Sequence, residues 1–586
     1  MKKAVALLLV LTMLLTGCGI LEPIDPTGST DTTGTTDGVT PPSGPVKVDF
    51  AQSDDVMFTE KDIQTEYSEG NSAVITLDGN SVSCNSSKVN VSGTTVTITG
   101  EGTFILRGTL NDGMIIVNAG EKDKPRIVLD GASVTSATSA ALYVLQAGKV
   151  FVTLAEGKEN TLANGGSFTV IDENNIDAAV FSKQDLTFNG SGSVTITSPA
   201  GHGIVCKDDL IFAGGTYTVH SASHGVDAND SLRMKSGTLT IDAGKDGIHV
   251  EDADDAATGF VYVSGGTLDI EAEGDGISAA LYAQIENGQI DILAGGGYEN
   301  GESHSSGGFG DFMGGGMGPG GDRPGGRSAE SATTDTSGTS MKGLKADGGI
   351  LISNGTLNID SADDAIHSDD LFVINGGNVT ISSGDDGIHA ETDLTITAGT
   401  IEIKESYEGL EAVNILISGG KTTLKATDDG LNAAGGMDSS GAGGRDEMFG
   451  GGMGGPGRPG GMGGASNGSI VITGGYTVVC GPNQGDTATL DYDTSATISG
   501  GVFIGTGAAG MAQTFSANTQ GVIAVSVGGG QSSGVKITVS DSNGKELVSY
   551  QPELAFSVII FSTPELISGQ SYHVRVGSVE GDITAN

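Results

Sequence analysis

The chain of 586 residues carries 73 Asp and Glu against 28 Lys and Arg, which gives a formal net charge of −45 at neutral pH. Nucleic acid is therefore excluded as a favoured partner, because the sequence offers no basic patch that could neutralise phosphates. Gly accounts for 98 residues and Trp is absent. The length is sufficient for one long repeat domain with a small terminal module.

The first 18 residues, MKKAVALLLVLTMLLTGC, contain two lysines, an apolar run and a small-residue cleavage site. This pattern is typical of a secretory signal, and its ending resembles the bacterial lipobox, in which the cysteine, here Cys18, is lipidated. Residues 19–48 are rich in Ser, Thr, Gly and Pro, so we expect a disordered tether. The sequence therefore predicts an extracellular lipoprotein anchored through Cys18 to the outer face of the bacterial cell membrane. A plain signal peptide is the alternative.

Beyond the tether, the sequence predicts a repeat domain over residues 49–515. One small residue recurs there at intervals of 21 or 22 residues in six of eight cases, and the two longer intervals carry insertions. An aliphatic, a polar and a compact residue follow it, which is the period-two pattern of a short strand with one buried face. A second strand in each repeat follows Gly-rich turns. Stacked strands at a constant period predict an all-β fold, a parallel β-helix. The small residues are Gly203, Gly225, Gly247, Gly276, Gly343, Ala365, Gly387, Gly409 and Gly430.

The position before each small residue, which we call the acidic column, is acidic in six of nine repeats. Stacked rungs bring equivalent positions to about 4.8 Å, where unpaired carboxylates repel and raise one another's pKa. Calcium, which takes six to eight oxygen ligands at about 2.3–2.6 Å, would relieve this repulsion. The alternative is that Asp-Gly only supplies turn chemistry. The predicted Ca²⁺ ligands are Asp246, Asp252, Asp254, Asp275, Asp363, Asp364, Asp385, Asp386, Glu408, Asp428 and Asp429.

The polar residue that follows each aliphatic one forms a second column, which we call the polar column. We predict that four of its members contact sugar, with solvent-facing side chains of no further role as the alternative: His249, His367, His389 and Glu411. Aromatic residues make up only 5% of the chain, which argues against strong stacking on cellulose. The candidate aromatic platforms, for which core or turn packing is an equal alternative, are Tyr262, Tyr282, Tyr298 and Tyr407.

Two insertions, at residues 295–340 and 435–466, share Gly-rich runs that are punctuated by Met, Phe and Arg. Such a composition cannot form a core. The insertions are therefore either tolerated surface loops or segments whose Met, Phe and Arg side chains engage a protein partner or a polymer surface. The last part of the chain, residues 516–586, contains strands such as AFSVIIFS and SYHVRVG. We predict that these strands form an antiparallel cap, because an uncovered end of the repeat stack would present a sticky edge.

Several segments resemble one known family. The runs GEGTFILRGTL, RIVLDGASVTSATSAALYV and VFVTLAEGKENTL, the repeated Asp-Asp-(Ala/Gly)-Ile-His and the ending VIIFSTPELISGQSYHV are similar to the clostridial carbohydrate-binding β-helix family. Its founding member is described as a polygalacturonate- and cellulose-binding protein. The resemblance spans residues 70–586 and implies a right-handed β-helix, related in fold to pectate lyases, with bound calcium. It places the metal role on Asp363, Asp364, Asp385 and Asp386, and further on Asp246, Asp275 and Glu408.

These observations together predict a calcium-binding protein that holds acidic plant cell-wall polysaccharide, polygalacturonate or pectin, or else cellulose, without cleaving it. The first alternative is a pectate lyase, in which calcium acidifies the proton beside a uronate carboxylate and a basic side chain removes it. Its candidate bases are Lys245, Lys342 and Lys345, with Arg233 as a further candidate. These lysines also fit simple charge balance within an acidic column. The second alternative is a surface adhesin or scaffold that uses the repeats as a spacer.

Overall fold

A computed structural model describes residues 53–253, 257–301, 340–433, 468–483, 487–509 and 512–586. Residues Pro45–Asn586 form one compact unit. Cys18, the tether, Asp254 and most of both Gly-rich insertions lie outside the described residues. Within the ranges given above, no helix is long and apolar enough to cross a membrane.

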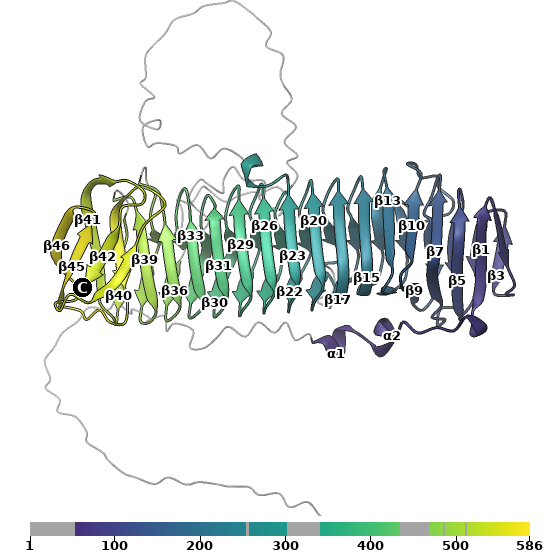
Figure 1. Cartoon of the computed structure of the whole chain (residues 1–586), viewed down its shortest axis with the longest axis horizontal. Helices are drawn as coiled ribbons and strands as arrows, with labels where there is room; N and C mark the ends of the chain where they lie inside the picture. The colour runs from purple at the N-terminus through teal and green to yellow at the C-terminus, as the bar shows by residue number, and fades with distance from the viewer. Residues whose placement is uncertain (1–52, 254–256, 302–339, 434–467, 484–486, 510–511) are drawn as a thin grey trace, which may run out of the picture. The chain divides into compact units, whose positions relative to one another are not determined.

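The described chain is almost entirely β, as the sequence predicted (Figure 1). The helices are all short: α1 (Asp54–Met57), α2 (Glu60–Ile63), η1 (Glu69–Asn71) and η2 (Tyr298–Asn300). Most strands belong to one large sheet, in which a strand pairs in parallel with the equivalent strand of the next repeat. Each repeat contributes three such strands, so the stack has three ladders, which we call A, B and C.

Ladder A contains the strands that follow the small residues. Its members are β4 (Thr95–Ile98), β6 (Met114–Asn118), β8 (Leu142–Gln146), β11 (Ala178–Ser182), β14 (His202–Cys206), β16 (Val226–Ala228), β18 (Ile248–Val250), β21 (Ile277–Ala279), β24 (Leu344–Ala346), β27 (Ile366–Ser368), β30 (Ile388–Ile396), β32 (Leu410–Ile417), β34 (Leu431–Ala433) and β37 (Leu490–Tyr492).

Ladder B follows directly after ladder A in each repeat. Its members are β1 (Ala73–Gly79), β5 (Thr103–Leu110), β7 (Arg126–Ser136), β9 (Val150–Leu154), β12 (Leu186–Gly190), β15 (Asp209–Ser221), β17 (Ser231–Ala243), β19 (Phe260–Val263), β22 (Tyr282–Ile285), β25 (Gly349–Ile352), β28 (Leu371–Ile374), the second halves of β30 and β32, β35 (Ser469–Ile472), β38 (Ser495–Ile498) and β40 (Ala517–Asn518).

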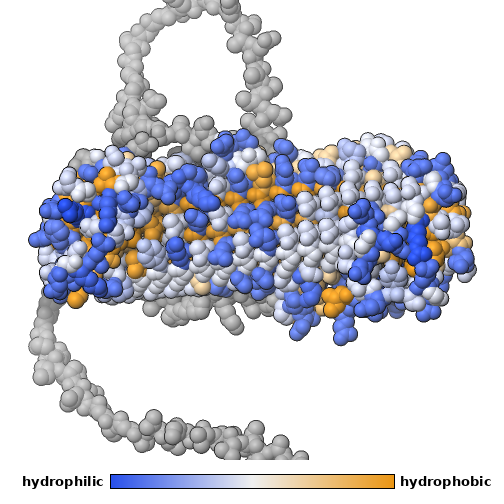
Figure 2. Space-filling view, viewed as in Figure 1, coloured by the Kyte–Doolittle hydropathy of each residue, from blue (hydrophilic) through white to orange (hydrophobic). Residues whose placement is uncertain are grey.

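Ladder C completes each repeat and lies on the face that Figure 1 shows. It contains the second halves of β1, β5, β7, β15 and β17, together with β10 (Glu159–Asn164), β13 (Ser193–Ser198), β20 (Thr267–Ala272), β23 (Gln289–Ala294), β26 (Thr356–Ser361), β29 (Asn378–Ser383), β31 (Thr400–Glu405), β33 (Lys421–Lys425), β36 (Tyr476–Cys480) and β39 (Val502–Gly507). The same face carries a band of hydrophobic residues among hydrophilic ones (Figure 2).

The sequence predicted two strands in each repeat and missed ladder B. Short apolar stretches such as Phe260–Val263 form that ladder, and all four residues of this strand are buried. A run of four buried residues does not alternate, so it lacks the period-two signal of a half-exposed strand. The register across the two long intervals is continuous, because Ile248 pairs with Ile277 and Ile277 with Leu344. The columns therefore keep the same register on either side of these two intervals.

Close packing explains why Gly or Ala occupies the recurring small position of each repeat. The aliphatic residues beside it, such as Ile204 and Val226, are fully buried. A β-carbon on Gly203 would lie 2.3 Å from Val219 Cγ1 and 2.5 Å from the carbonyl oxygen of Gly225. At Gly203 the chain thus passes too close to the next repeat for a β-carbon to fit without movement of the neighbouring atoms.

We expect Gly203→Ala to destabilise the fold by about 1–3 kcal/mol, because overpacking of this kind forces backbone shifts. The matched control is Gly581→Ala, since a β-carbon there would meet nothing within 4 Å. Thermal unfolding of the two variants tests the prediction. A melting temperature for Gly203→Ala that equals that of the control would show that the column is not limited by packing.

The N-terminal boundary of the repeats needs correction. The sequence predicted repeats from residue 49, but α1, α2 and η1 occupy residues 54–71 and run beside the stack. Met57 and Phe58 pack against Tyr262 of β19 and its neighbours. The carboxylate of Asp62 lies 2.8 Å from Lys149 Nζ. The stack begins at β1, where the short strands β2 (Ser81–Cys84) and β3 (Val89–Ser92) form antiparallel pairs with β1 and β4.

At the other end, antiparallel strands follow the last repeat. β44 (Phe556–Ser562) pairs antiparallel with both β39 and β41 (Val522–Gln531), so it covers the edge that ladder C would otherwise leave open. A separate four-stranded antiparallel sheet contains β42 (Ile537–Ser540), β43 (Glu546–Tyr550), β45 (Ser571–Val576) and β46 (Val579–Thr584).

Candidate functional site

The acidic column is a continuous stack at the start of ladder A. The backbone N–H of Gly247 donates to the carbonyl oxygen of Asp275 at 2.9 Å, and the N–H of Gly343 donates to that of Asp364 at 3.0 Å. The N–H of Gly387 likewise donates to the carbonyl oxygen of Glu408 at 2.9 Å. The acidic positions of successive repeats are therefore placed one above the next.

One oxygen of each stacked aspartate bonds to the backbone of the next repeat. Asp246 Oδ1 accepts the N–H of Asp275 at 2.9 Å, and Asp364 Oδ1 accepts the N–H of Asp386 at 3.0 Å. Asp386 Oδ1 accepts the N–H of Glu408 at 3.1 Å. Each aspartate thus links two rungs through Oδ1 and leaves Oδ2 to meet cations or neighbouring side chains.

Lys342 supplies a positive charge within the column. Its side chain is buried, and Nζ lies 2.8 Å from Asp364 Oδ2 and 3.4 Å from Asp363 Oδ1. His367 Nδ1 is also 2.8 Å from Asp364 Oδ2. Burial alone would raise the pKa of Asp364, but Lys342 and His367 outweigh burial and hold that pKa well below its usual range.

His367 differs from its predicted role as a sugar contact. The residue is only 2% exposed, and its Nε2 lies 3.0 Å from Asp369 Oδ1. Burial and the nearby Lys342 act to lower the pKa of His367, while hydrogen bonds to Asp364 and Asp369 raise it to about 9. Both ring nitrogens are occupied by carboxylates, so in this structure His367 balances charge within the fold.

In the next rung, around Asp385 and Asp386, there are more carboxylates than nearby cations. The pKa of Asp385 rises to about 8 because of burial and the neighbouring Asp364 and Asp363. Burial, Asp385 and Glu411 raise the pKa of Asp386 well above its ordinary value. Ligand atoms of Asp363, Asp364 and Asp385 lie within 4.8 Å of one another.

A second group of ligand atoms adjoins the first. Asp386, His389 and Glu411 also bring their ligand atoms within 4.8 Å of one another. His389 Nδ1 lies 3.6 Å from Glu411 Oε2 and 3.8 Å from Asp386 Oδ2. The imidazole of His389 and the carboxylate of Glu411, which were predicted as sugar contacts, therefore face the acidic column.

Other predicted metal ligands make bonds that hold the fold. Glu408 Oε2 accepts a hydrogen bond from Asn432 Nδ2 at 2.7 Å, and Asp429 Oδ1 accepts one from the N–H of Ala488 at 2.5 Å. Asp275 Oδ1 accepts the N–H of Lys342 at 2.8 Å.

The remaining acids lie at the edge of this network or outside it. Burial and the nearby Asp246 raise the pKa of Asp275 to about 6. Asp428 is half-buried beside its neighbour in the column, and Asp252 accepts a hydrogen bond from Thr258 Oγ1 at 2.9 Å. Among the described residues, neither Asp252 nor Asp428 belongs to a group of converging ligand atoms.

The candidate lyase bases occupy three different environments. Lys245 is exposed, Lys342 is buried against two aspartates, and Lys345 is half-buried with Nζ 3.9 Å from Asp347 Oδ1. Arg233 lies over the ring of Phe260 and pairs with Asp209 at 2.7 Å. Lys342 and Arg233 therefore already neutralise carboxylates of the fold.

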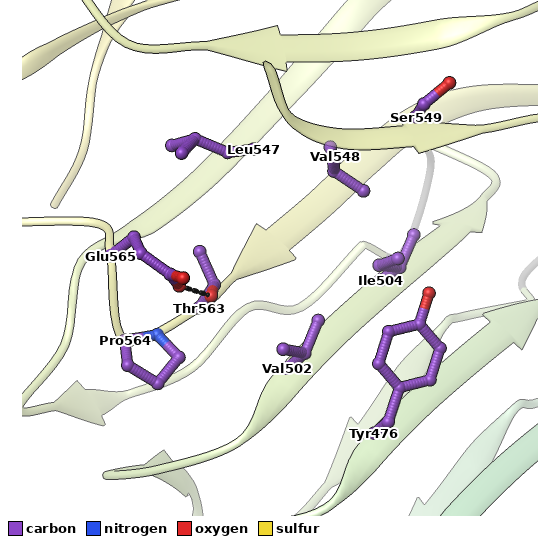
Figure 3. Close-up of a pocket in the computed structure, with 9 residues that line it drawn as sticks. All are labelled: Tyr476, Val502, Ile504, Leu547, Val548, Ser549, Thr563, Pro564 and Glu565. Carbon is purple, nitrogen blue, oxygen red and sulfur yellow. Dashed lines mark hydrogen bonds between the residues drawn. The ribbon is translucent and has the colours of Figure 1, made fainter. Parts of the chain in front are cut away.

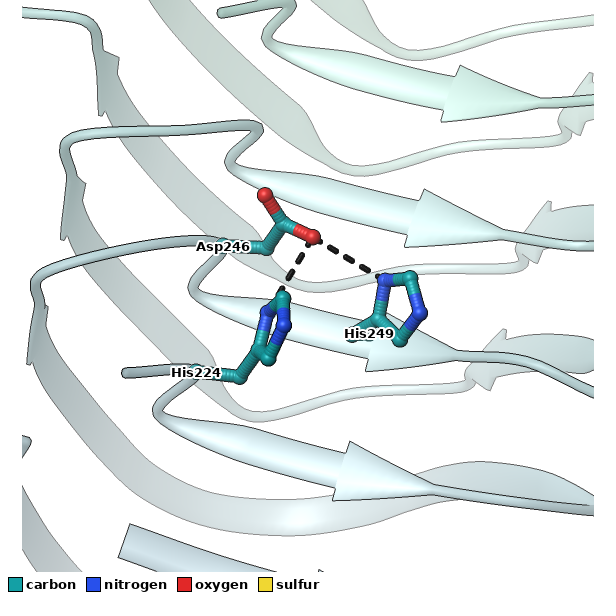
Figure 4. A group of neighbouring side chains, drawn as sticks. All are labelled: His224, Asp246 and His249. Carbon is teal, nitrogen blue, oxygen red and sulfur yellow. Dashed lines mark ion pairs between the residues drawn. The ribbon is translucent and has the colours of Figure 1, made fainter. Parts of the chain in front are cut away.

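A different cluster lies nearer the N-terminus of ladder A, and the sequence did not predict it. Figure 4 shows His224 and His249, from neighbouring rungs, around the carboxylate of Asp246. Asp246 Oδ2 lies 3.2 Å from His224 Nδ1 and 3.0 Å from His249 Nδ1. Burial would raise the pKa of Asp246, but the two imidazoles lower it below its ordinary value. A search of the sequence for two His residues in successive repeats, one in the acidic column and the other in the polar column, could have found this cluster.

The tyrosines that were considered as sugar platforms differ in exposure. Tyr262 is buried, and its hydroxyl donates to Asp54 Oδ1 at 3.2 Å, so it packs between ladder B and α1. Tyr282 stacks on Phe260 with ring centroids 4.9 Å apart. Tyr407 is half-buried, whereas Tyr298 is 36% exposed. Of these four, Tyr298 alone offers a largely open ring.

Two hollows lie on the described surface. A groove of about 510 Å³ crosses ladder C and is lined by polar side chains that include Asp269, Glu271, Asp291, Asp360 and Lys404. A second hollow, of about 420 Å³, lies where the last repeats meet the cap (Figure 3). The exposed ring of Tyr476 lines it beside Val502 and Pro564. The acidic groove crosses successive rungs, so an extended polymer chain could lie along it.

Two comparisons with known proteins give the same family description. The family model described as carbohydrate-binding domain-containing protein matches residues 92–387 and 371–445. A carbohydrate-binding domain-containing protein of Acetivibrio thermocellus is 35% identical over 150 residues, which are 25% of this chain and 52% of that protein. The chain thus spans about half the length of this relative. A solved structure of the polysaccharide lyase-like protein from C. thermocellum matches with a TM-score of 0.38 and 34% identity, over 38% of this chain and 92% of that one. The chain belongs to the family of carbohydrate-binding domain-containing proteins.

Proposed function

We propose that this protein binds acidic polysaccharide at the bacterial cell surface through calcium held on the acidic column. The observation that carries the proposal is the convergence of the ligand atoms of Asp363, Asp364 and Asp385 within 4.8 Å, beside Asp386. Burial and neighbouring carboxylates raise the pKa of Asp385 and that of Asp386. A hard divalent cation would let both carboxylates ionise. Lys342 already neutralises Asp364. The carboxylates that most need a further cation are therefore those of the next rung, Asp385 and Asp386.

The donor set fits calcium. Asp363 and Asp385 in one group, and Asp386 and Glu411 in the adjoining one, offer carboxylate oxygens, which calcium prefers over nitrogen. Calcium bound there would supply positive charge for the carboxylates of a polyuronate. The side chains around it hold the ligands in place, since Asp386 Oδ1 is fixed by the N–H of Glu408.

The overall charge favours calcium dependence. A chain with a formal net charge of −45 repels a polyuronate, so attraction requires bridging cations. Bound calcium would attract the carboxylates of polygalacturonate and pectin, whereas a neutral polymer such as cellulose offers no charge for it to bind. We also infer that the three parallel ladders wind as a right-handed parallel β-helix, and that lipidated Cys18 holds it at the outer face of the cell membrane.

We expect polygalacturonate in a native gel to retard the purified protein when calcium is present and not when a chelator replaces calcium. The double variant Asp385→Asn/Asp386→Asn should lose this retardation. The control Asp582→Asn, which changes an exposed carboxylate of the terminal sheet, should keep it. Equal retardation of all three proteins in chelator would overturn the proposal.

The same samples distinguish binding from cleavage. Pectate lyases release a 4,5-unsaturated product, which absorbs in the ultraviolet, so a binding protein should give no increase in absorbance. A calcium-dependent increase that is lost in Lys245→Ala or Lys342→Ala would assign the lyase activity instead. Retardation by neither polygalacturonate nor a soluble cellulose derivative would favour the adhesin or scaffold alternative.

A further inference from the structure

The cluster of His224, Asp246 and His249 is chemically distinct from the proposed calcium site. It offers two imidazole nitrogens and one carboxylate oxygen, whereas the groups around Asp385 and Asp386 are dominated by oxygen. Asp364, His367 and His389 form a group with the same donor types, but both ring nitrogens of His367 already contact carboxylates, those of Asp364 and Asp369. His224 precedes β16, Asp246 precedes β18, and His249 is the central residue of β18. The stacking of the repeats is what brings these three side chains together.

We propose that His224 Nδ1, His249 Nδ1 and Asp246 Oδ2 bind a divalent transition cation of the zinc class. The two nitrogens lie 3.2 and 3.0 Å from the carboxylate oxygen. Ligands at about 2.0–2.1 Å from a tetrahedral zinc ion are about 3.3 Å apart, so these separations match two edges of such a centre. Three protein ligands leave the fourth position for water or another small ligand.

Two buried nitrogen atoms give independent support. His224 Nδ1 and His249 Nδ1 are both inaccessible to solvent, and neither contact with Asp246 is aligned as a hydrogen bond. No other described residue gives either nitrogen a hydrogen-bond partner. Buried polar atoms in native proteins nearly always have a partner, and an ion is one explanation of an exception. A cation between the three donors would satisfy both nitrogens at once.

The surroundings hold the donors in position. Asp246 Oδ1 accepts the N–H of Asp275 at 2.9 Å, which fixes the carboxylate so that Oδ2 faces the imidazoles. The ring of His224 stacks between those of His202 and His249, with centroids 5.1 and 4.6 Å away. Calcium is a poor match here, because it takes six to eight oxygen ligands. This assignment replaces the calcium role that the sequence predicted for Asp246.

The test is a calorimetric titration of Zn²⁺ into the metal-stripped full chain, with excess Ca²⁺ present to fill oxygen-rich sites. We expect one tight zinc equivalent per chain. His224→Gln and His249→Gln should each weaken it by more than the roughly 10–100-fold cost of losing an outer-shell partner. His220→Gln is the matched control, because His220 is exposed and lies 3.2 Å from a single carboxylate, that of Asp242. Co²⁺ in place of zinc should give the intense visible bands of tetrahedral coordination.

Circular dichroism in chelator shows whether each variant is folded. If a histidine variant is not folded, Asp246→Asn replaces it, because the amide oxygen can still accept the N–H of Asp275 while the ligand charge is lost. Zinc affinity unchanged by these variants would overturn the proposal. So would displacement of zinc by Ca²⁺, or a weak Co²⁺ spectrum typical of octahedral coordination.

Discussion

Lys342→Met is expected to destabilise the protein by about 3–5 kcal/mol in chelator, because it removes a buried cation that contacts two carboxylates. Lys342 Nζ is 2.8 Å from Asp364 Oδ2 and 3.4 Å from Asp363 Oδ1, and the lysine is only 1% exposed. Methionine preserves most of the side-chain volume, so the change isolates the charge. Denaturant unfolding monitored by circular dichroism measures the loss.

Lys345→Met is the matched control for this prediction. Lys345 belongs to the polar column of the same rung, but its side chain is 26% exposed and its Nζ lies 3.9 Å from Asp347. Partly exposed pairs of this kind contribute about 0–1 kcal/mol. Lys342→Met and Lys345→Met should therefore differ clearly in unfolding midpoint. Equal midpoints would mean that Lys342 does not compensate the acidic column.

The stability of the calcium-free protein should fall as pH rises from about 4 to 8. The folded pKa of Asp385, about 8, lies above the ordinary value of 3.8, so the folded state binds more protons than the unfolded state in this window. A group of this kind stabilises the fold below its unfolded pKa and loses that contribution as pH rises through its folded pKa. The slope is at most about 1.4 kcal/mol per pH unit for each such group.

Other ionisable side chains change the stability at the two ends of this pH range. The pKa of His367 is about 9 against an ordinary 6.5, so its contribution also declines as pH rises from about 6.5 to 9. The pKa of Asp246 and that of Asp364 are lowered, so their contributions are lost only in acid, below the ordinary aspartate range. The decline between pH 4 and 6 is therefore assigned to the raised carboxylates together, which are Asp208, Asp275, Asp385 and Asp386. His202 opposes it, because burial lowers the pKa of that imidazole to about 4.

Calcium should flatten this decline, because a bound cation replaces the protons that otherwise neutralise Asp385 and Asp386. Melting temperatures measured from pH 5 to 8, in calcium and in chelator, test this expectation. Asp385→Asn should make the profile in chelator less steep, whereas Asp55→Asn, which changes an exposed carboxylate, should leave it unchanged. Parallel profiles with and without calcium would show that the raised carboxylates do not bind the ion.

Much of the repeat geometry could be predicted from the sequence. The spacing of Gly203, Gly225 and Gly247 identified the column that later stacks through backbone hydrogen bonds, and the aliphatic residues after it are buried as expected. These features follow from local period and residue size. Ladder B could not be predicted, because four consecutive buried residues such as Phe260–Val263 lack alternation. The helices beside the stack carry no repeat signal.

The sequence predicts the column to which each residue of the candidate site belongs, but it does not predict which side chains contact one another. The sequence placed Asp363, Asp364, Asp385 and Asp386 in one stack, and the structure brings them together. It could not show that Lys342 points into that stack or that His367 is buried. Both facts depend on side-chain direction across rungs, which spacing alone does not fix. The same reason hid the cluster of His224, Asp246 and His249, in which the first two belong to the acidic column and His249 belongs to the polar column.

The central claim is most directly tested by calorimetric titration of oligogalacturonate into the purified protein, in calcium and in chelator. The account predicts binding in calcium, none in chelator, and at least about tenfold weaker binding by Asp385→Asn/Asp386→Asn, a loss of about 1.4 kcal/mol. Binding that is equally strong in chelator, or unchanged in the double variant, would contradict the claim that calcium on the acidic column holds the polysaccharide.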